Sequence, residues 1–168
     1  MTCPTTPLGV TVLGSGSHGN ALLIHCGDAG VLVDAGFSLK ELRRRLQVAR
    51  LPESIVRGII VTHEHSDHIS GLRVCANHFR VPVFMTRPCA EVLRQRDPAL
   101  GQLSLFAPGG AFTVSPFEIE PFSIPHDAND PVAFVVRCGA CKIGVVTDLG
   151  FAGSAVEYQL RQCNTIVL

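Results

Sequence analysis

Short apolar runs, each bounded by polar or glycine-rich segments, follow one another along the whole chain. Such runs are typical of strands, whereas apolar positions spaced three and four apart are typical of helices. The pattern predicts strands at Val10–Leu13, Ala21–Cys26, Val31–Asp34, Gly58–Val61, Val81–Met85, Phe112–Val114, Phe117–Ile124, Val132–Cys138, Cys141–Thr147 and Thr165–Leu168. It predicts helices at Ser38–Val48, Asp67–Phe79, Pro88–Arg96 and Ser154–Gln162. Meandering strands followed by strands that alternate with helices predict an α/β fold of two packed sheets flanked by helices.

Composition is typical of a single domain, which we expect to cover residues 1–168. The chain is 46% hydrophobic and long enough to bury one sizeable core. Its formal net charge at pH 7 is zero, so no overall positive field attracts nucleic acid, and any basic track for such a substrate must be local. The run Arg43–Arg45 lies on a predicted helix, where we expect a solvated face.

The seven cysteines have no regular spacing, which argues against a disulfide framework. Cys138 and Cys141 flank a predicted two-residue turn and are expected to be incidental neighbours on paired strands. Met1–Pro7 lacks the basic and apolar stretches of a signal peptide, and no apolar run approaches transmembrane length. We therefore expect a cytoplasmic location and no membrane partner.

The segment Thr62–His68, which reads T-H-E-H-S-D-H, carries the clearest chemistry. It follows the apolar strand Gly58–Val61, so its side chains are expected to sit in a loop held by a rigid element. Imidazole and carboxylate groups together suit zinc, iron or manganese. A tight loop can turn four of these side chains toward one point, namely His63, His65, Asp67 and His68. A polar, solvated loop is the alternative, but this density of potential ligands favours a metal site.

A zincin helix does not explain this segment. That motif needs two histidines one helical turn apart, H-E-x-x-H, and Asp67 stands where the second histidine is required. The helix is expected to begin only near Asp67. This aspartate suits the N-cap or the first turn of a helix.

The glycine-rich segment Gly14–Asn20 matches the dinucleotide fingerprint G-x-G-x-x-G in letters only. That fingerprint works when a helix follows, because the pyrophosphate rests on the helix N-terminus. Here the apolar run Ala21–Cys26 follows and is closed by Gly27–Gly30, which predicts a hairpin. No nucleotide cofactor is expected.

Two aspartates end apolar strands, where an unpaired buried carboxylate would be unfavourable. Asp148 therefore needs a cation or hydrogen-bond donors, and a metal is a natural partner. Asp34 has the same requirement, but we expect it to orient a ligand histidine or a loop amide rather than bind metal itself. His126, taken alone, would be an ordinary loop histidine.

A set of motifs in this chain resembles the metallo-β-lactamase superfamily. In chain order, it consists of the glycine-rich segment, Val31–Gly36, H-x-H-x-D-H, His126 and Asp148. Within this superfamily, the set is similar to the YycJ/WalJ-like branch of exonucleases and phosphodiesterases. The resemblance covers nearly all of the chain and implies the αββα sandwich, with the site along one rim of the sheets.

The resemblance also implies the role of each site residue. It assigns the first metal to His63, His65 and His126, the second metal to Asp67 and His68, and the bridging position to Asp148. It makes Asp67, His68 and Asp148 the catalytic residues, acting through a hydroxide held between two divalent metals, zinc or manganese, with iron also suitable. The family pattern adds one more histidine to the second metal from a later segment, and this chain contains no counterpart.

The implied function is hydrolysis of phosphodiester bonds, with DNA as substrate and exonuclease action. Two alternatives stay open, since the fold alone does not choose among substrates. One is a small-molecule hydrolase of thioesters or cyclic phosphodiesters. The other is an inactive metal-binding fragment.

The last residues, Asn164–Leu168, read as a strand that is still apolar where the sequence stops. Domain ends are usually exposed and polar. We therefore expect the C-terminal part of the domain to be missing and the second metal to bind weakly. Self-association through an open sheet edge is expected for the same reason.

Overall fold

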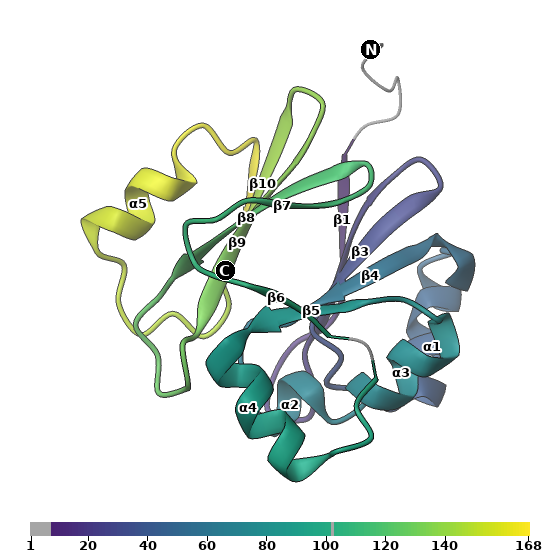
Figure 1. Cartoon of the computed structure of the whole chain (residues 1–168). Coiled ribbons are helices and arrows are strands. Elements are labelled where there is room, and N and C mark those ends of the chain that lie inside the picture. The colour runs from purple at the N-terminus through teal and green to yellow at the C-terminus, as the bar shows by residue number, and fades with distance from the viewer. Residues whose placement is uncertain (1–7, 102) are drawn as a thin grey trace.

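Two sheets pack face to face in the computed structural model of this protein, which describes residues 8–101 and 103–168 (Figure 1). The first sheet has the strand order β1-β2-β3-β4-β5-β6. Strands β1 to β3 pair antiparallel, and β3 to β6 pair parallel. The bounds are β1 (Gly9–Gly14), β2 (Ala21–Cys26), β3 (Ala29–Val33), β4 (Val56–Ile60), β5 (Val83–Thr86) and β6 (Leu103–Phe106).

The second sheet has the order β11-β10-β9-β8-β7. Its neighbours pair antiparallel except β10 and β11, which are parallel. The bounds are β7 (Phe112–Val114), β8 (Phe117–Ser123), β9 (Val132–Cys138), β10 (Cys141–Val145) and β11 (Thr165–Val167). The helices are α1 (Leu39–Val48), α2 (Ser66–Ile69), α3 (Leu72–Phe79), α4 (Arg87–Arg96) and α5 (Ser154–Leu160), with a 3₁₀ turn η1 (Glu53–Ile55).

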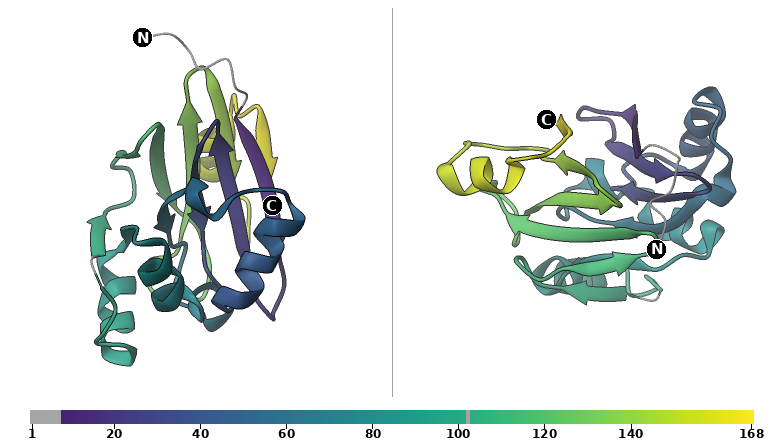
Figure 2. Two further views of the ribbon diagram at one scale, coloured as in Figure 1. Left: turned by 90° about the vertical axis from the view of Figure 1, so that its right-hand side faces the viewer. Right: turned by 90° about the horizontal axis from the view of Figure 1, so that it is seen from above.

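Strand β3 shows how the layers form, because successive side chains of a strand point to opposite faces. Leu32 packs in the cluster that joins the first sheet to its helices, whereas Val31 and Val33 pack in the cluster between the sheets. A third cluster joins the outer face of the second sheet to Val156 of α5. The order helix, sheet, sheet, helix is visible in Figure 2, with α5 in yellow and α1 in blue on opposite outer sides. The predicted αββα sandwich is confirmed.

The directions of the strands bring their ends together at one rim. Strands β3 and β4 are parallel, so their carboxyl ends share an edge. Strands β8 and β10 both pair antiparallel with β9, so they too run in one direction and end together. The segments that follow these four strands carry the predicted site residues.

Three predictions of local structure are wrong or incomplete. The strand β6 and the turn η1 were not predicted. The helix predicted at Asp67–Phe79 is two helices, because the chain breaks at Ser70 and Gly71 to contact the loop after β3. The Gly71 amide donates to the Ala35 carbonyl at 2.8 Å, and the Ser70 hydroxyl donates to the Gly36 carbonyl at 2.7 Å.

Other predictions of local structure are confirmed. Strand β2 follows Gly14–Asn20 and pairs antiparallel with β3, with Cys26 opposite Ala29, as the predicted hairpin requires. Cys138 and Cys141 face each other across β9 and β10. The helix predicted to begin at Ser38 is α1, and Ser38 is its N-cap, accepting a hydrogen bond from the Glu41 amide. Within the described residues, no helix is both long enough and apolar enough to cross a lipid bilayer.

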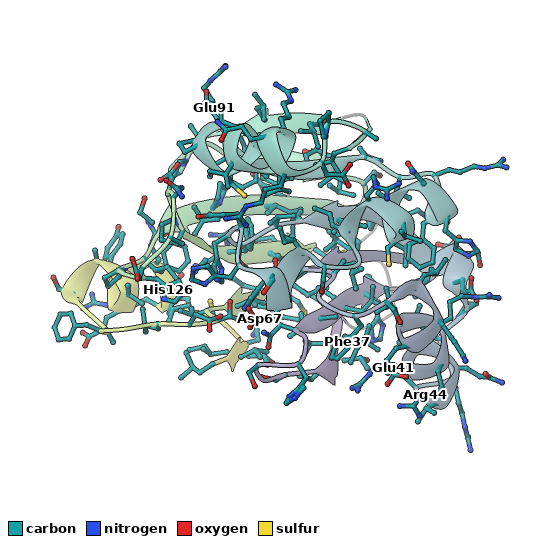
Figure 3. All side chains as sticks on the ribbon, turned by 90° about the horizontal axis from the view of Figure 1, so that it is seen from below. Phe37, Glu41, Arg44, Asp67, Glu91 and His126 are labelled. Atoms are coloured by element: carbon teal, nitrogen blue, oxygen red, sulfur yellow. The ribbon has the colours of Figure 1, made fainter. Side chains whose placement is uncertain are left out.

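The arginine run on α1 is only partly solvated. Arg44 is exposed and pairs with Glu41, and both are labelled in Figure 3. Arg45 departs from the prediction. Its guanidinium lies 4.0 Å from the centre of the Phe37 ring and donates to the Leu13 carbonyl, so this side chain packs α1 onto the sheet.

Candidate metal centre

Four histidines and three aspartates gather where β3, β4, β8 and β10 end. Figure 3, which views the molecule from below, labels two residues of this centre, Asp67 in α2 and His126 after β8. We call the following set the candidate metal centre: Asp34, His63, His65, Asp67, His68, His126 and Asp148.

The loop after β4 is held by backbone hydrogen bonds from three sides. The Asp34 amide donates to the Ile60 carbonyl at 2.9 Å, and the Val61 amide donates to the Phe84 carbonyl at 2.9 Å. The Val132 amide of the second sheet donates to the Thr62 carbonyl at 3.1 Å. The histidine loop therefore starts from a fixed point between the two sheets.

One group of potential ligands consists of His63, His65 and His126. Nε2 of His63 lies 3.0 Å from Nδ1 of His65, and Nε2 of His126 lies 3.3 Å from the same Nδ1. One ligand atom from each residue falls within 4.8 Å of the others. The histidine after β8 thus meets the two histidines after β4, the grouping that the family resemblance implies.

A second group consists of His63, His68 and Asp148, again with ligand atoms within 4.8 Å of one another. Nε2 of His68 lies 3.1 Å from a carboxylate oxygen of Asp148 and 3.5 Å from one of Asp67. Asp67 occupies the first turn of α2, one of its two predicted positions, while His65 stands at the N-cap. Because His63 belongs to both groups, the two lie side by side.

The protonation of His63 suits a metal ligand. Burial and the neighbouring charge of His68 lower the pKa of His63 to about 4, so the ring is neutral at neutral pH and keeps a free lone pair. Burial also lowers the pKa of His68, but the hydrogen bond to Asp34 and the carboxylates of Asp148 and Asp67 outweigh it and raise the pKa above its ordinary value. Imidazoles beside carboxylates are a donor set that fits divalent zinc, manganese or iron.

Asp34 makes the supporting contacts expected of it. The side chain is buried, and its two oxygens accept hydrogen bonds from the Thr62 amide and hydroxyl, each at 2.8 Å. Oδ2 also lies 2.8 Å from Nδ1 of His68. In its neutral form His68 therefore carries its proton on Nδ1, which leaves the Nε2 lone pair directed at Asp67 and Asp148.

The backbone at both strand ends adopts a conformation that is uncommon for aspartate. Asp34 has φ 60° and Asp148 has φ 55°, in the left-handed region. The two carboxylates differ in exposure, however. Asp34 is buried, but the side chain of Asp148 is 35% exposed. The sequence argument that Asp148 needs a partner because it is buried was therefore wrong, and its contact with His68 is the observation that stands.

Asn20 was missed by the sequence analysis. Its side-chain amide donates to a carboxylate oxygen of Asp67 at 2.9 Å, and its backbone amide donates to the Asp67 carbonyl at 2.7 Å. Its side-chain oxygen accepts from the Gly16 amide at 2.9 Å. The glycine-rich segment thus supports the metal centre. The sequence contained one signal for this role of Asn20, which is an amide side chain at the end of the glycine-rich segment, just before a strand.

A cavity of about 370 Å³ lies beside Asp67 and Asp148. Its lining includes residues of the glycine-rich segment, Thr147 from the segment after β10 and Val167 of β11. Its volume is within the range of small-ligand sites.

The family model of the metallo-β-lactamase superfamily matches residues 14–161. The chain belongs to the metallo-β-lactamase superfamily. The family predicted from the motifs is therefore confirmed.

Two relatives in this superfamily carry the names of the branch that the motifs resemble. Exodeoxyribonuclease YycJ of Bacillus anthracis is 35% identical over 160 residues, which cover 94% of this chain and 60% of the relative. Exodeoxyribonuclease WalJ of Streptococcus pneumoniae is 30% identical over 147 residues, which cover 84% of this chain and 54% of the relative. The chain thus spans little more than half the length of these relatives.

Solved metallo-β-lactamase structures share the fold. The protein YhfI from Bacillus subtilis superposes with a TM-score of 0.79 at 20% identity, over 95% of this chain and 70% of that one. At this level of identity the likeness establishes the αββα architecture.

Proposed function

We propose that this metallo-β-lactamase chain is a metal-dependent hydrolase of phosphodiester bonds that acts on DNA as an exonuclease. The observation that carries the proposal is the pair of adjacent ligand groups sharing His63, at the rim where four strands end. The two exodeoxyribonuclease relatives support DNA as the substrate.

We assign His63, His65 and His126 to a first metal ion. The close approach of their ring nitrogens supports this assignment. We assign Asp67 and His68 to a second ion. Asp148 would then bridge the two, since its carboxylate lies against His68 and shares a ligand group with His63.

The bound ions would supply Lewis acidity, acidifying water and stabilising negative charge on the phosphoryl oxygens. Side chains of the protein hold the proposed ligands in position. Asp34 fixes the ring of His68, and Asn20 fixes the carboxylate of Asp67. Zinc and manganese are the ions we propose.

Charge gives a separate argument for metal. Asp34, Asp67 and Asp148 place three carboxylates at the centre, and an anionic phosphodiester would be repelled by them alone. Divalent ions reverse the sign of the local field. Since the whole chain has zero formal net charge, attraction of DNA depends on local fields, and this is one of them.

The decisive experiment measures metal content and cleavage on the same purified protein. The protein is stripped with chelator, reloaded with Zn²⁺ or Mn²⁺, and given end-labelled single- and double-stranded DNA, circular single-stranded DNA and a panel of thioesters. We expect mononucleotides or short products from linear DNA only with metal present. Cleavage of circular DNA would contradict exonuclease action. Turnover of thioesters without cleavage of DNA would instead identify a small-molecule hydrolase.

A further inference from the structure

Glu64 lies between two proposed ligands, yet its carboxylate takes part in neither ligand group. Glu64 is 4% exposed. One carboxylate oxygen accepts from the backbone amide of Asn129 at 3.0 Å and from its side-chain amide at 2.6 Å, and the other lies 3.3 Å from the same backbone amide. Within the described part of the chain, Asn129 is the residue other than Glu64 itself that donates hydrogen bonds to this carboxylate. The carboxylate of Glu64 thus binds a single residue of another loop, Asn129.

That residue belongs to the loop that carries His126. The Ala128 amide donates to the His126 carbonyl at 3.0 Å, so the turn between His126 and Asn129 is closed on itself. Fixing Asn129 therefore fixes the position of His126, three residues earlier. The preceding Pro125 carbonyl accepts from the Gly150 amide at 3.2 Å, which ties the other side of the loop to the segment after Asp148.

Glu64 is itself held from the opposite side. Its carbonyl accepts a hydrogen bond from the Arg96 guanidinium, at the end of α4, at 3.2 Å. Its neighbours His63 and Thr62 are buried, so the backbone of Glu64 has little freedom. The contact between Glu64 and Asn129 thus joins the fixed loop after β4, in the first sheet, to the exposed loop after β8, in the second.

We propose that Glu64 and Asn129 are a positioning pair that holds His126 against His63 and His65, and thereby sets the affinity for the first metal ion. The inference rests on the proposed function, since it requires that these histidines bind metal. It gives Glu64 a role other than that of a general base, the role glutamate has in H-E-x-x-H enzymes. A supporting hydrogen bond of this kind typically changes metal affinity by about 10–100-fold when removed.

The test is a double-mutant cycle on zinc affinity. The Kd for the first equivalent of Zn²⁺ is measured by competition with a chromophoric chelator for the wild type, Glu64→Ala, Asn129→Ala and the double variant. We expect each single substitution to weaken binding by about 10–100-fold. The double variant should bind about as weakly as the worse single variant, because both substitutions remove one shared contact. Glu64→Gln keeps an oxygen acceptor and should lose less than Glu64→Ala.

The controls separate positioning from a general loss of folding. Asn129 is exposed, so Asn129→Ala should fold even if Glu64→Ala does not. Asn164→Ala is the matched control, since Asn164 is also exposed and its side chain also hydrogen-bonds to another segment, accepting from the Lys142 backbone amide at 2.8 Å. Lys142 lies at the end of β10 remote from Asp148, so zinc affinity should be unchanged.

Thermal unfolding in excess EDTA completes the test. A purely structural role would lower the Tm in EDTA and leave the zinc Kd of the folded protein as in the wild type. Unchanged zinc affinity in Asn129→Ala, or losses that multiply in the double variant, would overturn the inference. Failure of the wild-type protein to bind zinc would overturn the proposed function, and the inference with it.

Discussion

Oδ2 of Asp34 lies 2.8 Å from Nδ1 of His68, and the two side chains are only 2% and 1% exposed. The same carboxylate accepts two hydrogen bonds from Thr62. One buried group therefore orients a proposed ligand and also fixes the start of the histidine loop. In metal sites such a partner selects the tautomer of the ring and restricts its rotation.

Asp34→Asn should weaken the second metal and the fold together. The variant has one acceptor oxygen where the native carboxylate has two, so either the Thr62 amide or His68 loses its partner. We expect metal binding about 10–100-fold weaker and a free energy of unfolding lower by about 1–3 kcal/mol. Zinc titration and urea denaturation measure the two effects. Asp28→Asn is the control, since the Asp28 side chain is 97% exposed and should change neither quantity.

Removal of a proposed ligand should abolish most metal binding. His63→Ala and His65→Ala each delete a ring that belongs to the first ligand group. We expect both variants to lose most bound metal, and any hydrolysis with it. His25→Ala and His78→Ala serve as controls, because His25 contacts Thr11 and His78 contacts Glu53 outside the centre. Equal metal content in all four variants would show that the assignment is wrong.

The stability of the protein in EDTA should depend on pH through His63. The ordinary pKa of this group is 6.5, and in the folded protein it is lowered to about 4. Between these values the unfolded chain binds the proton and the folded chain does not, so the free energy of unfolding falls as the pH is lowered through this window. Above pH 6.5 the ring is neutral in both states and has no such effect.

The comparison with His63→Gln isolates this contribution. The free energy of unfolding of the wild type, relative to the variant, should decrease as pH is lowered from 6.5 to about 4 and level off at either side. His68, whose pKa is raised, acts in the opposite direction and is present in both proteins. A difference that stays constant over this range would contradict the lowered pKa of His63.

The sequence predicted the layers of the fold because its strands alternate or run apolar in the expected way. Val31 to Val33 is apolar on both faces since the strand is covered by helices and by the second sheet. Strand β6 escaped prediction because it is a short edge strand of half-buried and exposed residues, Leu103 to Phe106. The break between α2 and α3 arises from contacts with Ala35 and Gly36, which are distant in sequence.

The candidate metal centre, like the fold, could be predicted only in part. Residue types and spacing pointed to the candidate ligands of the loop after β4, whereas His126 was found only through the family resemblance. The structure brings His63, His65 and His126 together. The supports Asn20 and Asn129 were not found, because an amide side chain in a loop has many ordinary roles. Their importance lies in what they contact across the fold, and only the tertiary structure supplies those contacts.

Gly36 provides a test of the packing that holds Asp67. Its backbone amide donates to the Asn20 carbonyl at 2.9 Å. A Cβ built on Gly36 would overlap the Asp67 carbonyl oxygen and lie 2.6 Å from the Asn20 backbone nitrogen. These are backbone atoms, so a larger residue cannot be accommodated by a change of rotamer. The segments around Asn20, Gly36 and Asp67 must separate to admit a methyl group.

Gly36→Ala should therefore displace α2 and with it Asp67 and His68. We expect the free energy of unfolding to fall by at least about 1–3 kcal/mol, the usual effect of forcing a methyl group into a packed interior. The second metal should bind more weakly than in the wild type even where the variant is folded. Gly101→Ala is the matched control, because among the described residues its added Cβ would meet the Asn77 side chain alone, at 3.7 Å. If Gly36→Ala unfolded and bound metal like Gly101→Ala, the close approach of these three segments would not be what places Asp67.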